Sequence, residues 1–239
     1  MFNQIGGLNS VGGPLSDNQI GGESFIRHCG NDKLIYDFKS GSGTTVYDKS
    51  HCGNNGTFGV GTAAPTWRRN SLYFDGGDYV NCGKQASIND MTEITYVLQI
   101  NPVVDSATII LIDKDAKKYI YLHTDNKLRG VIFGAVNANG YTETIISNVK
   151  KNIIITFSSI GDRKIYFYVD GTKVPNSTSN IAATLPLTSD ANGDLYLASR
   201  AGTQYFYTGT MYSFRIFNKG LSGIECQQEY LANKFRGNN

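Results

Sequence analysis

Short segments in which apolar and polar residues alternate fill most of this chain of 239 residues, and they constrain its fold more than any other feature. A period of two residues is the repeat of a β-strand that buries one face. Between the alternating segments stand glycine, asparagine and aspartate, which favour turns. The 27 glycines and 15 tyrosines, set against 3 methionines, suit many strands better than many helices. The sequence therefore predicts an all-β chain.

One segment illustrates the alternation. In KIYFYVDG (164–171), Ile165, Phe167 and Val169 are expected on one face, and the residues between them on the other. The Asp170-Gly171 pair that follows predicts a hairpin turn. The expected strands are 34–39, 71–76, 78–82, 94–100, 108–114, 119–125, 128–134, 142–148, 152–159, 164–171, 194–200 and 207–219.

A single helix is predicted near the end of the chain, in SGIECQQEYLANKF (222–235). Ser222 followed three residues later by Glu225 forms a capping-box pattern. The residues expected to share the face that packs on the strands are Ile224, Leu231 and Phe235. More than ten strands with one terminal helix predict a two-sheet antiparallel β-sandwich with one short C-terminal helix.

Composition excludes several classes of protein. A net charge of +2 with no basic block argues against nucleic-acid binding. No run of about 18 apolar residues occurs, so insertion into a membrane is not expected. Neither a phosphate-binding loop nor a dinucleotide fingerprint is present. These patterns favour a binding or structural protein.

The N-terminal 30 residues are too polar and too rich in glycine to fold alone, because each Gly-Gly pair loses backbone entropy and buries nothing. NQIGG occurs at 3–7 and again at 18–22, and no stretch resembles a signal peptide. One interpretation is a disordered leader. The other is an extended docking arm (1–30) that binds a neighbouring subunit by strand addition. Its apolar anchors would be Ile5, Leu8, Val11, Leu15 and Ile20.

The four cysteines form no CxxC pair, and the three histidines are scattered, so a zinc site is not expected. Two disulfides are candidates, Cys29 with Cys226 and Cys52 with Cys82. Without an export signal the chain would be made in a reducing compartment, where free buried thiols are the favoured alternative.

Four segments together resemble the landmarks of laminin-G-like, concanavalin A-like jelly-roll modules, in the order that the family has them. They are DFKSGSGTTVYDKSHCGNNGTF (37–58), SLYFDGGDYVNCG (71–83), KIYFYVDGTKV (164–174) and GTMYSFRIFNKGLSGIECQQEY (209–230). The resemblance covers about residues 33–235 and implies a jelly-roll domain at 31–239. It does not specify a ligand, because this superfold hosts many functions.

The closing strand departs from the family pattern. Related modules carry an acidic pair there that helps to hold a structural calcium, whereas this chain has Tyr212 and Ser213. Calcium needs six to eight oxygen ligands. The side chains that remain to supply oxygens are Asp48, Asn54, Asn55 and Asp75. No metal site and no cofactor are therefore predicted, and turn capping is the favoured role of Asp48 and Asp75.

Catalysis is not predicted. Glycoside hydrolases of this fold need two carboxylates that face each other across a cleft. Asp113 and Asp115 lie two residues apart, but DKDAKK (113–118) is typical of a charged hairpin tip. No Ser-His-Asp set is indicated either. A glycoside hydrolase is the least favoured of the alternatives.

Carbohydrate binding is the remaining chemistry, because a tyrosine offers a flat apolar face and a hydroxyl group. The candidate ligand-binding residues are Tyr141, Tyr205 and Tyr207. The competing interpretation is that these tyrosines only favour strands. Trp67 is expected to pack in the core.

The resemblance also implies a setting, because such jelly rolls are often displayed on virus and phage particles. The favoured hypothesis is a non-enzymatic virion structural protein: a phage decoration, fibre or tail-associated protein on the virion surface. Its arm would bind other virion proteins, with a homo-oligomer as a further candidate, and its jelly roll would bind surface glycans. The alternative is a secreted or cell-surface carbohydrate-binding module of a bacterial protein.

Overall fold

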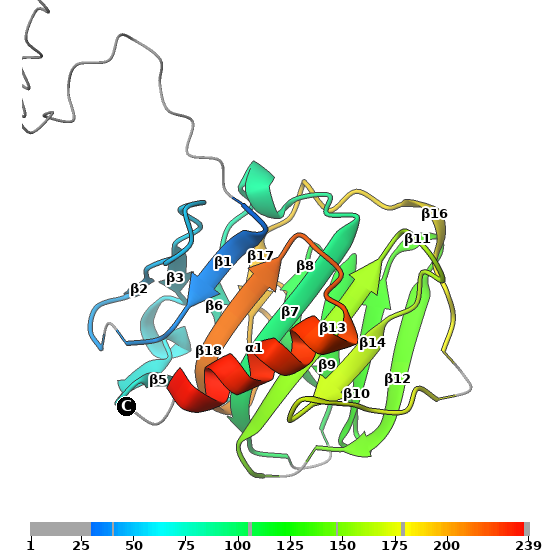
Figure 1. The fold of residues 1–239 in the computed structure, drawn as a ribbon. Coiled ribbons are helices and arrows are strands. Elements are labelled where there is room, and N and C mark those ends of the chain that lie inside the picture. Colours follow the sequence, from blue (N-terminus) through cyan, green and yellow to red (C-terminus); the bar gives the residue numbers. More distant parts are fainter. Residues whose placement is uncertain (1–29, 40, 105–106, 147, 178–179, 237–239) are drawn as a thin grey trace, which may run out of the picture.

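The chain folds into two antiparallel sheets that pack face to face, with one helix across the outer face of one of them (Figure 1). The computed structural model describes residues 30–39, 41–104, 107–146, 148–177 and 180–236. The predicted all-β sandwich with one C-terminal helix is confirmed. The proposed arm (1–30) and its anchors Ile5, Leu8, Val11, Leu15 and Ile20 lie outside the described residues, except for Gly30.

Sheet A has eight strands in the order β15-β14-β13-β7-β18-β5-β4, and β1 pairs with β18 beside this path. Its long central strands are the segments in which the alternation is clearest. The strands are β1 (Asp32–Tyr36), β4 (Thr66–Arg68), β5 (Ser71–Asp75), β7 (Glu93–Pro102), β13 (Lys151–Ser158), β14 (Tyr166–Val169), β15 (Thr172–Lys173) and β18 (Thr208–Phe217).

Sheet B also has eight strands, in the order β12-β10-β9-β8-β17-β6-β3-β2. They are β2 (Thr45–Val46), β3 (Gly56–Phe58), β6 (Val80–Asn81), β8 (Ile109–Lys114), β9 (Lys118–Leu122), β10 (Lys127–Ile132), β12 (Ala138–Ile145) and β17 (Leu195–Leu197). A further pair joins β11 (Gly134–Val136) to β16 (Thr184–Leu187), and two short 3₁₀ helices span Gly61–Ala63 and Ala86–Ile88.

The core lies between the two sheets and confirms the predicted faces of segment 164–171. Ile165, Phe167 and Val169 belong to this core, whereas Tyr168 packs in a second cluster on the outer face of sheet A. Trp67 packs against the core edge, 5.4 Å from the ring centroid of Phe58, as expected. Inward alternation thus supplies most of the apolar area that holds the sheets together.

Two glycines let the sheets approach closely. Gly130 and Gly140 are paired across β10 and β12 and face the core. A Cβ atom at Gly140 would lie 2.7 Å from Cβ of Ile165 and 2.9 Å from Cε2 of Phe167. Real side chains do not approach so closely, so this pair of glycines sets the spacing of the layers at this position.

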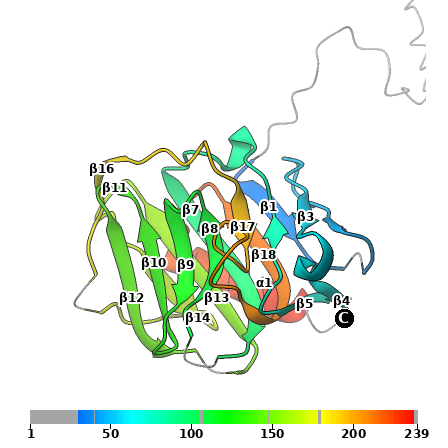
Figure 2. The ribbon, with the colours of Figure 1, turned by 180° about the vertical axis from the view of Figure 1, so that it is seen from behind.

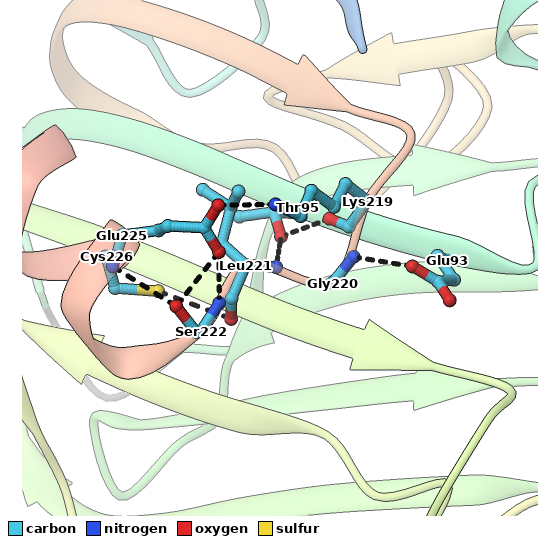
Figure 3. Close-up of polar contacts among 8 residues, drawn as sticks. All are labelled: Glu93, Thr95, Lys219, Gly220, Leu221, Ser222, Glu225 and Cys226. Carbon is cyan, nitrogen blue, oxygen red and sulfur yellow. Dashed lines mark hydrogen bonds and ion pairs between the residues drawn. The ribbon is translucent and has the colours of Figure 1, made fainter.

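Helix α1 (Gly223–Arg236) begins with the predicted capping box (Figure 3). The backbone N–H of Ser222 donates to Oε2 of Glu225 at 2.9 Å, and the backbone N–H of Glu225 donates to Oγ of Ser222 at 3.4 Å. Lys219 forms an ion pair with Glu225. Oγ1 of Thr95 accepts a hydrogen bond from the Leu221 N–H at 3.0 Å, which fixes the start of the helix to β7.

The predicted packing face of the helix was wrong. Ile224 is 73% exposed and Leu231 is 42% exposed, and the side chain of Phe235 lies outside the described residues. The helix instead packs through Cys226 and Tyr230 against Val97, Ile154, Tyr168, Phe217 and Leu221. Cys226 and Tyr230 are four residues apart and share one side of the helix, and Ile224 and Leu231 lie outside that side.

Both candidate disulfide pairings were also wrong. Cys82 lies in the core between the sheets, Cys226 lies on the side of α1 that packs on sheet A, and both are buried free thiols. Burial raises the pKa of each thiol to about 12, so neither is a nucleophile at neutral pH. Cys52 is disulfide-bonded, and its partner lies outside the described residues.

No helix in the described part of the chain is both long and apolar enough to cross a bilayer.

Candidate functional site: the open face of sheet B

The outer face of sheet B is the candidate binding surface. Figure 2 shows this sheet in front, and the helix α1 lies behind it on the other layer. In β9 the core takes Ile120 and Leu122, so Tyr119 and Tyr121 point outward. The same alternation turns the side chains of Arg129 in β10 and Tyr141 in β12 outward. The strands therefore present aromatic and cationic groups on one surface.

Strand register brings these side chains into adjacent positions. Arg129 is paired directly with Tyr121 on one side and with Tyr141 on the other. Asp113 of β8 is paired with Tyr119 of β9 and with Tyr196 of β17. Residues that face each other across neighbouring strands lie within side-chain contact. We call the surface formed by Tyr119, Tyr121, Arg129, Tyr141 and Tyr196 the aromatic face.

Ring contacts hold the aromatic face in place. The ring centroids of Tyr119 and Tyr121 lie 5.7 Å apart. Arg129 lies over the ring of Tyr141, with Cζ 5.3 Å from its centroid, and Arg200 lies over Tyr119 at 5.0 Å. Such cation–π contacts stabilise the guanidinium groups and leave part of their donors turned away from the ring.

Partial burial changes the pKa of the tyrosine hydroxyl groups on the aromatic face. Burial raises the pKa of the Tyr119, Tyr121 and Tyr196 hydroxyls above the ordinary tyrosine value. All three are therefore protonated at neutral pH and act as hydrogen-bond donors as well as acceptors. A half-exposed ring with a protonated hydroxyl suits a ligand that has both an apolar face and hydroxyl groups.

Both oxygens of the Asp113 carboxylate accept hydrogen bonds from the backbone. Oδ1 of Asp113 accepts the Ala116 N–H at 3.2 Å, and Oδ2 accepts the Ala201 N–H at 3.1 Å. Burial raises the pKa of the Asp113 carboxyl, although these hydrogen bonds oppose the shift. Asp113 thus fixes the loop that carries Arg200 and positions that side chain over Tyr119.

The structure separates the three tyrosines that the sequence singled out. Tyr141 lies on the aromatic face, and its role in ligand binding stays a prediction. Tyr205 is 46% exposed and is not part of the aromatic face, and its carbonyl accepts the Ile110 N–H of β8 at 2.8 Å. Tyr207 was a wrong choice as a ligand-binding residue: it is fully buried, and its hydroxyl donates to the carbonyl of Thr210 at 3.1 Å.

Sequence reasoning missed four residues of the aromatic face. Tyr119 and Tyr121 alternate in YIYLHTD, and this alternation was a usable signal that they share a face. Arg129 and Tyr196 gave no such signal, because only the register of β10 and β17 brings them to the others.

The expected hairpin tip at 113–118 is present, but it is not solvated. Lys114 and Lys118 are each 2% exposed. Lys118 forms a buried ion pair with Asp190, and Nζ of Lys114 donates to the Gly193 carbonyl at 2.6 Å. The alternation turns both lysines toward the edge of the core, where partners from distant loops satisfy them.

The residues considered for calcium are engaged in turns. Oδ1 of Asp48 accepts the N–H groups of Ile35 and Ser50, at 2.9 and 2.8 Å, and Oδ2 accepts the Asn54 N–H at 2.8 Å. Asp75 accepts the Gly77 N–H at 3.0 Å. Among the described residues, no group of three or more His, Cys, Asp or Glu is placed to hold a metal ion.

An antiparallel sandwich with one open, aromatic sheet defines a jelly-roll module of the lectin type. The chain belongs to the concanavalin A-like lectin/glucanases superfamily, whose family model matches residues 74–226. No curated protein matches the chain in sequence.

Solved structures share the fold at low identity. Trypanosoma rangeli sialidase in complex with sialic acid is 15% identical over 84% of this chain and 33% of its own length, with a TM-score of 0.63. The binding domain of Paraclostridial Mosquitocidal Protein 1 is 16% identical over 84% of this chain and 52% of its own, also at 0.63. The Botulinum neurotoxin serotype G binding domain is 15% identical over 85% and 51%, at 0.65. This chain thus spans a third to a half of these proteins, and the likeness shows the fold.

Proposed function

We propose that the chain is a non-enzymatic carbohydrate-binding module whose ligand stacks on the aromatic face. The observation that carries this proposal is the direct pairing of Tyr121, Arg129 and Tyr141 across three neighbouring strands. Two half-exposed rings beside a cation offer stacking surfaces and hydrogen-bond donors at fixed spacing. The fold neighbours support a binding role, since one is a sialidase in complex with sialic acid and two are binding domains of toxins.

The absence of catalysis is part of the proposal. A glycosidase needs one carboxylate free to act on the substrate and a second one opposite it. On the aromatic face, both oxygens of Asp113 accept backbone N–H groups, and Asp125 pairs with Arg129 at 2.8 Å. These acids hold loops and side chains in position, which favours binding over hydrolysis.

A glycan array tests the proposal. Wild type is compared with Tyr121→Ala and with Tyr47→Ala, a matched control at a tyrosine that is 54% exposed elsewhere on the surface. Wild type and the control are expected to bind the same glycans, and Tyr121→Ala is expected to bind them about tenfold more weakly, as for the loss of a central aromatic contact. Thermal unfolding confirms that both variants are folded.

Two results would contradict the proposal. One is equal binding by Tyr121→Ala and wild type. The other is release of reducing sugar from a bound glycan, which would show hydrolysis.

We further propose that the module is a structural component of a virus particle, such as a phage decoration, fibre or tail-associated protein. The glycine-rich sequence of residues 1–30 supports this placement, since such a segment gains order by lying on a neighbouring protein. The expected finding is the chain in purified particles, in a copy number that matches the particle symmetry. Isolation of the protein from its source as a free monomer would contradict its assignment to a virus particle.

A secreted or cell-surface module of a bacterial protein is the second candidate, and Cys52 favours it. The Cys52 side chain is disulfide-bonded, and disulfides form in oxidising compartments. Alkylation of the denatured native protein separates the two candidates. Two reactive thiols, Cys82 and Cys226, are expected for the exported module, whereas four are expected for a chain that stays in a reducing cytoplasm.

A further inference from the structure

A cavity of about 610 Å³ lies on the opposite side of the molecule from the aromatic face. It opens between the outer face of sheet A, at β1, β7 and β18, and the C-terminal half of α1. Its volume is within the range of small-molecule sites. In Figure 1 the helix crosses sheet A beside β18 and β1, which form this side of the molecule. We call it the helix cavity.

Four cationic side chains line the helix cavity besides Arg215. They are Lys39, Lys49, Arg69 and Lys150. Within the described part of the chain, none of the four forms an ion pair with a carboxylate. The one acidic side chain in the lining is Asp37. Concentrated positive charge around a concave surface raises the local concentration of anions.

Two buried donors among the lining residues have no acceptor. Arg215 is 8% exposed, and its terminal nitrogens pair with Glu229 and with Asp32, the latter at 2.9 Å. Its Nε has no partner, and neither has Nδ2 of Asn233, a residue that is 6% exposed. A buried donor without an acceptor destabilises the folded state, so a site that keeps two of them is suited to an oxygen-bearing ligand.

The remaining lining is neutral and polar. Gln99, Ser213 and Asn70 present amide and hydroxyl groups. Tyr212 supplies a ring, and Nζ of Lys150 lies 4.1 Å from its centroid. A ligand with an anionic group and several hydroxyl groups matches both halves of this lining.

We propose that the helix cavity binds an acidic sugar of the uronic acid class. Its carboxylate accepts hydrogen bonds from Arg215 Nε and Asn233 Nδ2 and is attracted by the four cationic side chains of the lining, Lys39, Lys49, Arg69 and Lys150. Its hydroxyl groups bind the amide and hydroxyl side chains. The helix cavity shares no residue with the aromatic face. The two binding proposals are therefore tested independently of each other.

Isothermal titration of the full chain with glucuronic acid tests the proposal, and glucose is the uncharged control ligand. The test variant is Arg69→Gln with Lys150→Gln. The matched control is Lys84→Gln, a lysine that donates to the Asn192 carbonyl away from the cavity. Wild type and Lys84→Gln are expected to bind glucuronic acid and to show at least tenfold weaker binding of glucose. The double variant is expected to lose about tenfold in affinity for glucuronic acid, because it removes two of the four cationic side chains that attract the carboxylate.

Inorganic sulfate distinguishes a sugar site from a site for any oxyanion. Competition by sulfate at high concentration, with glucuronic acid binding more tightly, supports the proposal. Binding of sulfate without binding of glucuronic acid would overturn it, and so would equal affinities for glucuronic acid and glucose. Unchanged binding in the double variant would place the ligand elsewhere and would also overturn it.

Discussion

Burial divides the tyrosines of this chain into two groups with different roles. Tyr207 is completely enclosed, with its ring centroid 5.8 Å from that of Phe74, and burial raises the pKa of its hydroxyl well above the ordinary value. Tyr121 and Tyr141 leave part of each ring accessible. Composition alone does not separate these groups, because tyrosine suits a strand in either position.

Tyr207→Phe is expected to destabilise the protein by about 1 kcal/mol, since it removes one buried hydrogen bond and keeps the ring. The carbonyl of Thr210 loses the partner that lies 3.1 Å away. Chemical denaturation measures the change. Glycan binding on the array is expected to stay at the wild-type level, and a loss of binding by this variant would return Tyr207 to the list of ligand-binding residues.

At the scale of the element, helix α1 depends on the few contacts that fix its start. The capping box satisfies N–H groups that the helix itself leaves unpaired. Lys219 links the same glutamate to the end of β18, and Thr95 links the chain to β7. Because the helix forms one wall of the helix cavity, its anchoring also sets the shape of that site.

The pH dependence of stability reports on this cap. The hydrogen bond from Lys219, followed by those from Ser222, lowers the pKa of Glu225 from 4.5 to about 2. A carboxyl whose pKa is lower in the folded state stabilises that state above its unfolded pKa and loses the contribution as the pH falls. Glu225→Gln is therefore expected to be less stable than wild type at pH 7, and the difference is expected to shrink as the pH falls from about 4.5 toward 2.

Chemical denaturation at pH 7 and at pH 3 measures that difference. Ser222→Ala is the companion variant, expected to cost about 1 kcal/mol at pH 7. Glu229→Gln controls for charge, because Glu229 lies on the same helix but pairs with Arg215. A difference between wild type and Glu225→Gln that stays constant from pH 7 to pH 3 would contradict the role of the ionised cap.

Strand alternation made the long elements predictable. Segments 94–100, 152–159 and 207–219 correspond to β7, β13 and β18 within a few residues. The strands β2, β3, β4, β11 and β16 were not predicted, because each has only two to four residues and, unlike the short strands β6 and β17, none lies inside a longer alternating segment. So short a segment cannot display a period of two, and its strand geometry comes from the neighbour with which it pairs.

The candidate sites were less predictable than the fold. Tyr141 was identified from its aromatic character in a turn-rich segment, but its partner Arg129 follows from the register of β10 with β12, which includes a bulge. The helix cavity gave no signal, since Arg69, Lys150 and Asn233 are far apart in sequence. Sites assembled by long-range packing become visible only when the sheets and the helix are placed.

At the scale of the whole molecule, the two sheets give the protein two independent outer surfaces. The helix and the cationic cavity occupy the surface of sheet A, and the aromatic face occupies that of sheet B. The core between them is rigid and close-packed, so a change that spreads the layers would disturb both surfaces at once.

Gly140 provides the test of that coupling. A Cβ atom there would meet Ile165 at 2.7 Å and Phe167 at 2.9 Å, so Gly140→Ala forces the layers apart or the side chains out of their rotamers. The expected cost is about 1–3 kcal/mol, measured by chemical denaturation. Gly77→Ala is the matched control, because its nearest neighbour is Oδ1 of Asp75 at 3.6 Å, an ordinary contact. If Gly140→Ala were as stable as Gly77→Ala, the close approach of the sheets at β10 and β12 would not be a constraint on this fold.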